Sequence, residues 1–208
     1  MANTDWLSQG TLVLASNNKG KISEFETLFA ELNLPIQVIP QGQLQIEDAI
    51  EDGLSFVENA IIKARHASRL SGKPAIADDS GLCVPILNGA PGIYSARYAG
   101  EHGNDNANNE KLLQQLQPFR QSQQPIEAMF VCVLALVQHA DDPLPQIFQG
   151  IWHGEILEQA LGENGFGYDP LFWLPHLNCS SAQMSKTEKN RISHRGQAMQ
   201  QLKAQLTV

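Results

Sequence analysis

The run Met129–Val137 contains only apolar residues, and no other segment constrains the fold as strongly. It is far shorter than the roughly 20 residues that a membrane-spanning helix needs. A short apolar run between polar flanks is typical of a strand that is buried on both faces. We therefore predict a central strand over 127–138 and a partner strand over 146–153, joined through the turn signal Asp141–Pro143.

Shorter strands and helices alternate along the rest of the chain. Short apolar runs predict strands at 11–15, 36–39, 75–77 and 168–174. Apolar residues three or four positions apart predict helices over 22–32, 56–67 and 104–117, and one last helix that starts at the capping box Ser185–Glu188. No repeat or linker interrupts this order, so we predict an α/β fold with a mixed sheet and a single domain over 11–208. Residues 1–10 are expected to be a disordered N-terminal extension.

Composition narrows the class of protein. The 208 residues carry 14 Lys and Arg against 22 Asp and Glu, a formal net charge of −8. A nonspecific DNA binder would carry a basic face, so no nucleic-acid partner is expected. Three scattered cysteines without CxxC spacing favour reduced thiols and a cytoplasmic location. We find neither a signal peptide nor a membrane span, so no membrane partner is expected.

A polar loop between the first predicted strand and helix is a candidate phosphate site, made of Ser16, Asn17, Asn18, Lys19, Gly20 and Lys21. The N-terminus of a helix presents free N–H groups and partial positive charge, both of which attract phosphate. It is not a Walker A loop, which would need Gly in place of Ala15 and Ser or Thr in place of Ile22. A solvated polar turn remains the alternative.

Two adjacent carboxylates, Asp78 and Asp79, precede Ser80 and Gly81. This pattern predicts a sharp turn at a sheet edge. Hard cations such as Mg²⁺ prefer carboxylate oxygens and keep several waters. A turn stabilised by the Asp side chains is the alternative, but a neighbouring phosphate loop favours the metal site.

Two further segments could contact a ligand. In 165–170, Phe166 and Tyr168 could stack on a flat base and Asp169 could accept a hydrogen bond, although core aromatics at a strand start are an alternative. In 186–195, a frayed or kinked helix start would be needed to bring Lys189 near the adjacent His194 and Arg195. A solvated helix face is the alternative for this second segment.

Six segments in this order and at these separations resemble the inosine triphosphate pyrophosphatase family, the bacterial dITP/XTP pyrophosphatases. They are Leu14–Lys21, Phe56–Ala67, Ala75–Leu82, Gly89–Gly100, Gly165–Phe172 and Glu188–Ala198. The resemblance runs from about Thr11 to Leu202. It implies a two-lobed, mixed-sheet α/β fold with the active-site cleft between the lobes, and a homodimer. It implies Mg²⁺-dependent hydrolysis of ITP, dITP and XTP to the monophosphate plus pyrophosphate, which keeps these nucleotides out of nucleic acids.

The resemblance also implies residue roles. Asp79 would be the metal ligand and the proton acceptor for the attacking water, with Glu51 as a second acidic group near the metal. Ser16–Lys21 would bind the triphosphate, Lys63 would add a phosphate contact, and Ser80 would contact the substrate. The base and sugar pocket would comprise Phe166, Gly167, Tyr168, Asp169, Lys189, His194 and Arg195.

Two positions depart from the family pattern. Ile50 stands where the family commonly has the first of two acidic residues, so any metal role at this place falls on Glu51. Gln183 stands at a commonly acidic position and is assigned no role.

Base selectivity has a physical rationale in Arg195, which can only donate hydrogen bonds. A donor suits a 6-oxo purine and opposes the 6-amino group of adenine. Guanine also carries a 6-oxo group, so its rejection requires a close group at the 2-position that the sequence does not identify. Three alternatives remain: a pyrophosphatase for other modified nucleotides or pyrimidines, a nucleotide-binding regulator without hydrolysis, and a purely structural α/β protein.

Overall fold

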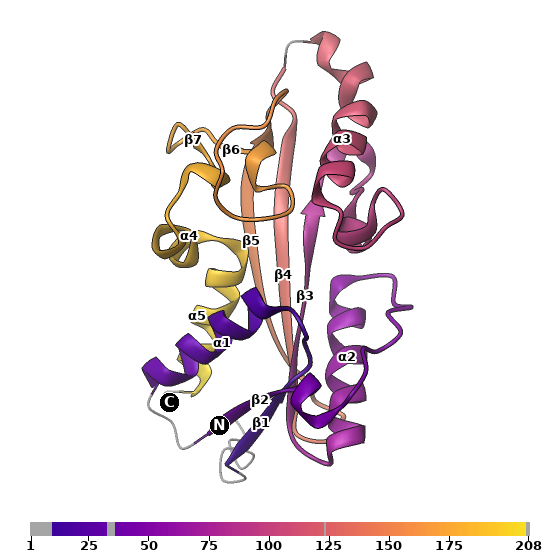
Figure 1. The fold of residues 1–208 in the computed structure, drawn as a ribbon, viewed down its shortest axis with the longest axis vertical. Helices are drawn as coiled ribbons and strands as arrows, with labels where there is room; N and C mark the ends of the chain where they lie inside the picture. The colour runs from indigo at the N-terminus through magenta and orange to yellow at the C-terminus, as the bar shows by residue number, and fades with distance from the viewer. Residues whose placement is uncertain (1–9, 33–35, 123, 207–208) are drawn as a thin grey trace. The chain divides into compact units, whose positions relative to one another are not determined.

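The computed structural model describes residues 10–32, 36–122 and 124–206. Within them, one seven-stranded sheet has the order β2-β1-β3-β4-β5-β6-β7 (Figure 1). The strands are β1 Thr11–Leu14, β2 Gln37–Pro40, β3 Ala75–Cys83, β4 Glu127–Val137, β5 Gln146–Ile156, β6 Phe172–Leu174 and β7 Cys179–Ser180. β1 pairs in parallel with β2 and β3, whereas β6 pairs antiparallel with β5 and β7. The predicted α/β class with a mixed sheet is confirmed.

Helices alternate with these strands, largely as the periodicity predicts. They are α1 Lys19–Leu32, α2 Phe56–Ser71, α3 Asp105–Leu116, α4 Lys186–Ile192 and α5 His194–Leu206. Among the residues described, none of the helices is long and apolar enough to cross a membrane.

Internal contacts divide the chain into two compact units. Unit 1 comprises the chain up to Asp79, Val133–Gln149 and the residues from Ala198 onward. Unit 2 comprises Ser80–Cys132 and Gly150–Gln197. Of the predicted N-terminal extension, residues 1–9 lie outside the described part of the chain.

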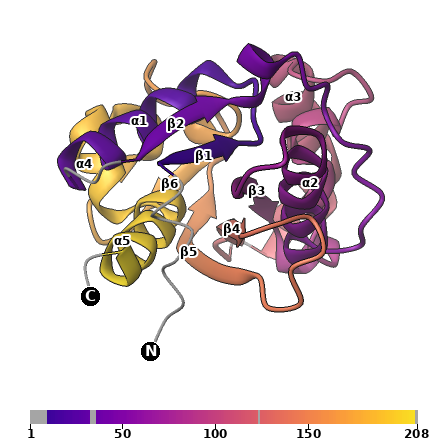
Figure 2. The same ribbon diagram turned by 90° about the horizontal axis from the view of Figure 1, so that it is seen from below.

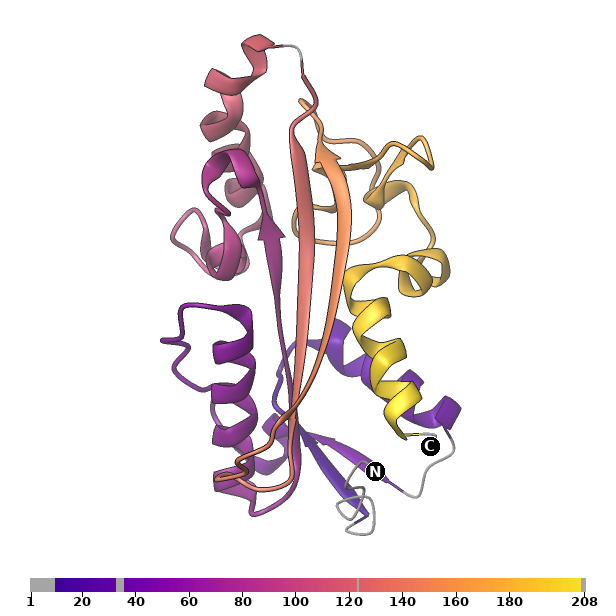
Figure 3. The same ribbon diagram turned by 180° about the vertical axis from the view of Figure 1, so that it is seen from behind.

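In unit 1, α2 lies on one side of the strands, and α1 with the later part of α5 lies on the other (Figures 2 and 3). The face of α2 toward the strands is built from fully buried Ala60, Ala64 and Ala67. Small side chains allow a helix to pack close to a sheet. The helix begins at Ser55, whose hydroxyl accepts the Glu58 N–H, and ends at Gly72. The φ of this glycine is +67°, a conformation that favours glycine at the end of a helix.

Unit 2 has its own hydrophobic core, which contains aromatic side chains of β4, β5 and β6. Phe172 is fully buried, with ring centroids 4.6 Å from Phe130 and 5.2 Å from Trp152. Leu112 and Leu116 of α3 join the same cluster. Each fully buried side chain of this size contributes roughly 1.5–3 kcal/mol to folding. This packing fixes β5, β6 and α3 around the segment that carries Phe166–Asp169.

The predicted turn at Asp78–Gly81 is wrong, because β3 continues through these residues to Cys83. Gly81 lies close to a neighbouring segment, where a Cβ would collide with Gly92 O and Ser95 Oγ. Two adjacent acidic residues in a buried strand violate strand patterning, since burying a charge is unfavourable unless it is paired.

The predicted single last helix is also wrong in one respect. The capping box of Ser185 and Glu188 is present, but α4 ends at Ser193, whose extended backbone separates it from α5. The kink that the sequence required between Lys189 and Arg195 is therefore a complete break. The predicted strand over 168–174 is shorter than expected, because Asp169–Leu171 forms a 3₁₀ turn before β6.

Candidate active site

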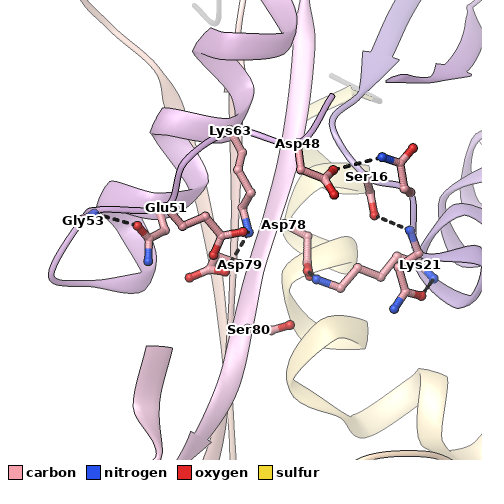
Figure 4. A network of polar contacts seen from close by, with 12 residues as sticks. Ser16, Lys21, Asp48, Glu51, Gly53, Lys63, Asp78, Asp79 and Ser80 are labelled. Atoms are coloured by element: carbon pink, nitrogen blue, oxygen red, sulfur yellow. Dashed lines mark hydrogen bonds and ion pairs between the residues drawn. The ribbon is translucent and has the colours of Figure 1, made fainter. Parts of the chain in front are cut away.

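Asp78 and Asp79 of β3 each meet a lysine, and the two lysines come from helices on opposite sides of the strands (Figure 4). Asp78 pairs with Lys21 of α1. Asp79 Oδ1 lies 2.7 Å from Nζ of Lys63 on α2. Successive side chains of a strand point to opposite faces, so adjacent acidic residues reach different helices. Each buried carboxylate thus has the cation that its burial requires.

Lys63 also contacts Glu51, whose Oε1 lies 3.2 Å from Nζ. The segment that carries Glu51 is held by Asn59 of α2, because Asn59 Oδ1 accepts the Gly53 N–H at 2.9 Å. A Cβ on Gly53 would lie 2.7 Å from this oxygen, so glycine permits the close approach. The structure therefore brings Glu51, Lys63 and Asp79 together, as the resemblance implied for a metal and phosphate site.

The electrostatics of this cluster favour a proton-accepting Asp79. Burial raises the pKa of the Asp79 carboxyl above its ordinary value, and the neighbouring Lys63 offsets this only in part. Burial acts to lower the pKa of Lys63, but the charges of Asp79 and Glu51 outweigh it and raise the pKa. A carboxylate with a raised pKa accepts a proton more readily than an ordinary aspartate does.

The second oxygen of Asp79 distinguishes the site. Oδ2 is buried and has no hydrogen-bond partner among the described residues, whereas Oδ1 is held by Lys63. A buried acceptor without a partner is unfavourable by about 1–3 kcal/mol, so this oxygen is available to a ligand or water.

The donor set of this cluster fits a hard cation. The described residues hold no group of three or more His, Cys, Asp or Glu side chains that could bind a metal. Mg²⁺ commonly binds through one or two carboxylates and takes its remaining oxygens from water and substrate phosphates. Asp79 Oδ2 and the Glu51 carboxylate supply this type of site.

The predicted phosphate loop is the start of α1, since Lys19, Gly20 and Lys21 form its first turn. Asn18 organises this turn, because its Oδ1 accepts the Lys21 N–H at 3.1 Å while its own N–H donates to Ser16 Oγ. Asn17 Nδ2 donates to Asp48 Oδ1 at 3.0 Å. The side chain of Lys19 lies outside what the structure describes. The loop thus presents a capped helix N-terminus, which suits an anion.

In unit 2, Asp169 organises the segment Gly165–Asp169 from within. This carboxylate is 1% exposed, and its Oδ2 accepts the Phe166 N–H at 2.9 Å and pairs with Lys189. Its Oδ1 accepts the Ser181 hydroxyl at 2.9 Å. Both oxygens are therefore used by the protein, which makes Asp169 a residue that shapes the segment.

The two aromatic residues of this segment have different environments. Phe166 is 54% exposed, and Lys189 Nζ lies 5.2 Å from its ring centroid. Tyr168 is 3% exposed, and its hydroxyl donates to Ser95 O at 2.9 Å. Burial raises the pKa of Tyr168 far above its ordinary value, so the hydroxyl keeps its proton. Only Phe166 offers a ring face to a ligand, while Tyr168 supports the segment from the core.

The two residues that follow the helix break are both buried. Arg195 Nη2 donates to Ser80 Oγ at 3.1 Å, which connects α5 to β3 within unit 2. The His194 ring stacks on Phe130, with centroids 4.8 Å apart and planes at 12°. His194 thus packs in the aromatic core, and Arg195 carries the donor groups.

Sequence reasoning missed residues whose partners are distant in the chain. Ser181 and Asp48 hold candidate site residues but belong to no recognisable motif, and Asn59 lies within the segment Phe56–Ala67 without a role assigned to it. The available signal for Asn59 was an amide side chain next to Ala60 in a predicted amphipathic helix, and the structure shows that this asparagine is fully buried. Gln183, to which the sequence assigned no role, has a structural one, because its Oε1 accepts the Ser180 N–H at 2.9 Å.

Comparisons with known proteins identify the family of the chain. The model of the Ham1 family matches residues 12–205. A dITP/XTP pyrophosphatase of Acinetobacter baylyi is 79% identical over 206 residues, which cover 99% of this chain and 98% of the relative. A dITP/XTP pyrophosphatase of Pseudomonas aeruginosa is 55% identical over 195 residues, covering 94% and 96%.

Solved structures show the same fold. A HAM1 protein from Coxiella burnetii has a TM-score of 0.89 and 47% identity, covering 95% of this chain and 98% of that protein. The Staphylococcus aureus Ham1 protein has a TM-score of 0.84 and 45% identity, with the same coverage. The resemblance found in the sequence is confirmed: the chain belongs to the Ham1 family.

Proposed function

We propose that this chain hydrolyses the deaminated purine nucleotides ITP, dITP and XTP to the nucleoside monophosphate and pyrophosphate, with Mg²⁺ as cofactor. Relatives up to 79% identical carry the name dITP/XTP pyrophosphatase. The observation that carries the proposal is Asp79, a buried carboxylate with one oxygen held by Lys63 and the other open to a ligand. A regulator that only binds nucleotides has no need of such a group.

At the phosphate end, the residues of unit 1 have distinct tasks. Asp79 accepts the proton of the attacking water, and Lys63 holds the carboxylate in place. Lys63 and Lys21 neutralise phosphate charge, and the first turn of α1 donates N–H groups to phosphate oxygens. Positioning and charge neutralisation are the main contributions that a protein makes to phosphoryl transfer. When bound to Asp79 and Glu51, Mg²⁺ would neutralise charge on the phosphates and lower the pKa of a bound water.

At the base end, the residues of unit 2 select the purine. The exposed ring of Phe166 stacks on the base, and Lys189 lies beside that ring. Arg195 is buried and can only donate hydrogen bonds. It can therefore donate to the oxygen of a 6-oxo purine, whereas the 6-amino group of adenine would face it as a second donor. A buried mismatch of this kind gives discrimination on the order of 10⁴.

The test is to incubate the purified chain and Mg²⁺ with ITP, XTP, dITP, ATP and GTP, and to identify the products by phosphorus NMR. Monophosphate plus pyrophosphate from the first three nucleotides alone is the expected result. Diphosphate plus orthophosphate would contradict the chemistry, and ITP binding without turnover would favour the regulator. Turnover of other modified nucleotides in place of these three would favour the related pyrophosphatase. In isotopically labelled water, label in the monophosphate would place the attack at the α-phosphorus, and label in pyrophosphate would place it at the β-phosphorus.

Two further properties belong to the same proposal. The homodimer is supported by the resemblance to the family, and light scattering should give twice the chain mass of 22.9 kDa. A monomeric mass at working concentration would refute it. The cytoplasmic location is supported by three free cysteines, Cys83, Cys132 and Cys179. Fractionation of cells that express the chain should recover it with cytoplasmic markers, and recovery outside the cell would contradict this location.

A further inference from the structure

Two side chains of α3 hold the backbone of Gly167, the residue that follows Phe166. The Gly167 N–H donates to Asp105 Oδ2 at 2.7 Å. The Gly167 C=O accepts the Asn109 Nδ2–H at 2.9 Å. Asp105 and Asn109 are four positions apart on one helix, so they lie on the same face, one turn apart. Both polar groups of Gly167 are thus fixed by a helix that is distant in sequence.

The chemistry of Asn109 indicates that its donor matters. Its Nδ2 reaches Gly167, but its Oδ1 is buried and has no hydrogen-bond partner in the described structure. An unpaired buried oxygen is unfavourable by about 1–3 kcal/mol, which an apolar side chain would avoid. The contribution of this amide is therefore its contact with Gly167.

The neighbouring residues of the segment are fixed as well. Phe166 N–H donates to Asp169 Oδ2 at 2.9 Å, and the Tyr168 hydroxyl donates to Ser95 O at 2.9 Å. Gly165 and Gly167, which flank Phe166, have φ values of +82° and +63°. Such backbone turns are open to glycine and would otherwise be free to move. The contacts from α3 hold the backbone of Gly167, the residue that follows the exposed Phe166.

We propose that Asp105 and Asn109 are positioning residues that set base selectivity by fixing the backbone beside Phe166. The proposal rests on the proposed function, since it assumes that Phe166 stacks on the purine. Guanine has the same 6-oxo group, to which Arg195 would donate a hydrogen bond. The rejection of guanine therefore depends on contacts at the 2-position. A backbone held at both the N–H and the C=O of Gly167, and so at two successive peptide units, can exclude a 2-amino group, whereas a mobile backbone moves aside and admits it. Displacements of about 1 Å are enough to change rates by roughly 100-fold.

The test compares isosteric and truncated variants with a matched control. Asn109→Asp keeps the shape but removes the donor, and Asn109→Ala removes the contact altogether. Asp105→Asn keeps an oxygen acceptor without the charge. Asn106→Asp and Asn106→Ala are the controls, because Asn106 is exposed on the same helix. For each variant, kcat and KM are measured with ITP, GTP and ATP, and the thermal unfolding midpoint is recorded.

We expect Asn109→Asp and Asn109→Ala to raise the KM for ITP and to lower the ITP/GTP ratio of kcat/KM by about 10-fold or more. Asp105→Asn should give a smaller change in the same direction. The kcat for ITP and the ITP/ATP ratio should change far less, since Asp79 and Arg195 are untouched. The Asn106 variants should match the unmodified chain in every parameter.

Two results would overturn the proposal. One is an unchanged ITP/GTP ratio in both Asn109 variants, measured on folded protein. The other is an equal loss of kcat for every nucleotide in step with the unfolding midpoint, which is the mark of a purely structural role. Failure of the unmodified chain to hydrolyse ITP, or equal turnover of ITP and GTP, would instead refute the proposed function and with it this proposal.

Discussion

Lys63 Nζ lies 2.7 Å from Asp79 Oδ1, and Oδ2 of the same carboxylate has no hydrogen-bond partner among the residues that the structure describes. One oxygen is thereby anchored while the other remains available for chemistry. The lysine comes from α2 and the aspartate from β3, so helix packing against the strand sets this distance.

Asp79→Asn should lower kcat for ITP by roughly 100-fold to 10,000-fold, because the amide cannot accept the proton of the attacking water. Asp141→Asn is a suitable control, since Asp141 is a surface aspartate of unit 1 whose side chain is 88% exposed. Steady-state kinetics of both variants, with unfolding midpoints, checks the prediction. A kcat for Asp79→Asn near that of the control would remove Asp79 from the mechanism.

Lys63→Met should destabilise the chain by about 3 kcal/mol near neutral pH, because it leaves buried Asp79 without its cation. The double variant Lys63→Met with Asp79→Leu should recover much of that stability without recovering activity. Urea unfolding of the two single variants and the double variant gives the coupling free energy. Additive losses would show that the two residues do not interact energetically.

The raised pKa of Asp79 predicts how its contribution depends on pH. The native state holds the proton more tightly than the unfolded chain, whose ordinary value is 3.8. The stabilisation that this proton provides is full below that value and is lost as pH rises through the native pKa. The free energy of unfolding of Asp79→Asn relative to the unmodified chain should therefore increase as the pH rises from 3.8 through the native pKa of Asp79. A flat or falling difference in urea titrations would contradict the pKa direction.

Arg195→Ala should reduce the preference for ITP over ATP by roughly 100-fold or more, because the donor that opposes the 6-amino group is lost. Ser80→Ala serves as a comparison, since it removes the partner of Arg195 Nη2 but keeps the guanidinium. It should retain most of the preference. The ratio of kcat/KM for ITP and ATP measures both effects, and an unchanged ratio in Arg195→Ala would reject the assigned role.

Gly165→Ala should be more harmful than Gly167→Ala, although both glycines have positive φ values. A Cβ at Gly165 would collide with the Asp169 carboxylate, whereas a Cβ at Gly167 would meet no heavy atom within 4 Å among the described residues other than its own chain neighbours. Gly167→Ala should be unfavourable by about 1–2 kcal/mol from the backbone conformation alone. Gly165→Ala should lower the free energy of unfolding by more than Gly167→Ala does, and it should raise the KM for ITP. Equal unfolding midpoints and equal KM values would show that Asp169 moves aside freely.

Elements that depend on neighbouring residues could be predicted from the sequence. The apolar run Met129–Val137 identified β4, the spacing of apolar residues over 56–67 identified α2, and the Ser185–Glu188 capping box identified the start of α4. Each of these signals lies within a few residues of the element it specifies. The motifs that carry the family resemblance are local in the same sense.

The elements that could not be predicted depend on partners far along the chain. The sequence predicted a turn at Asp78 and Asp79, where the structure has a strand. Nothing near these residues in the sequence indicates that Lys21 and Lys63 neutralise their charges. The break between α4 and α5 at Ser193 was predicted only as a frayed or kinked helix start, which would bring Lys189 near His194 and Arg195.

The sequence by itself determined the α/β class, the order of most elements and the residue types from which the site is built. Only the tertiary structure decided which of those residues keep an exposed or unpaired group and which are buried in contacts that support the site. Phe166 and Tyr168 look alike in sequence, yet one is exposed and the other is buried against Ser95. The physical reason is that burial, ion pairing and hydrogen bonding depend on distances in space, and Asp105 reaches Gly167 across 62 positions of the chain.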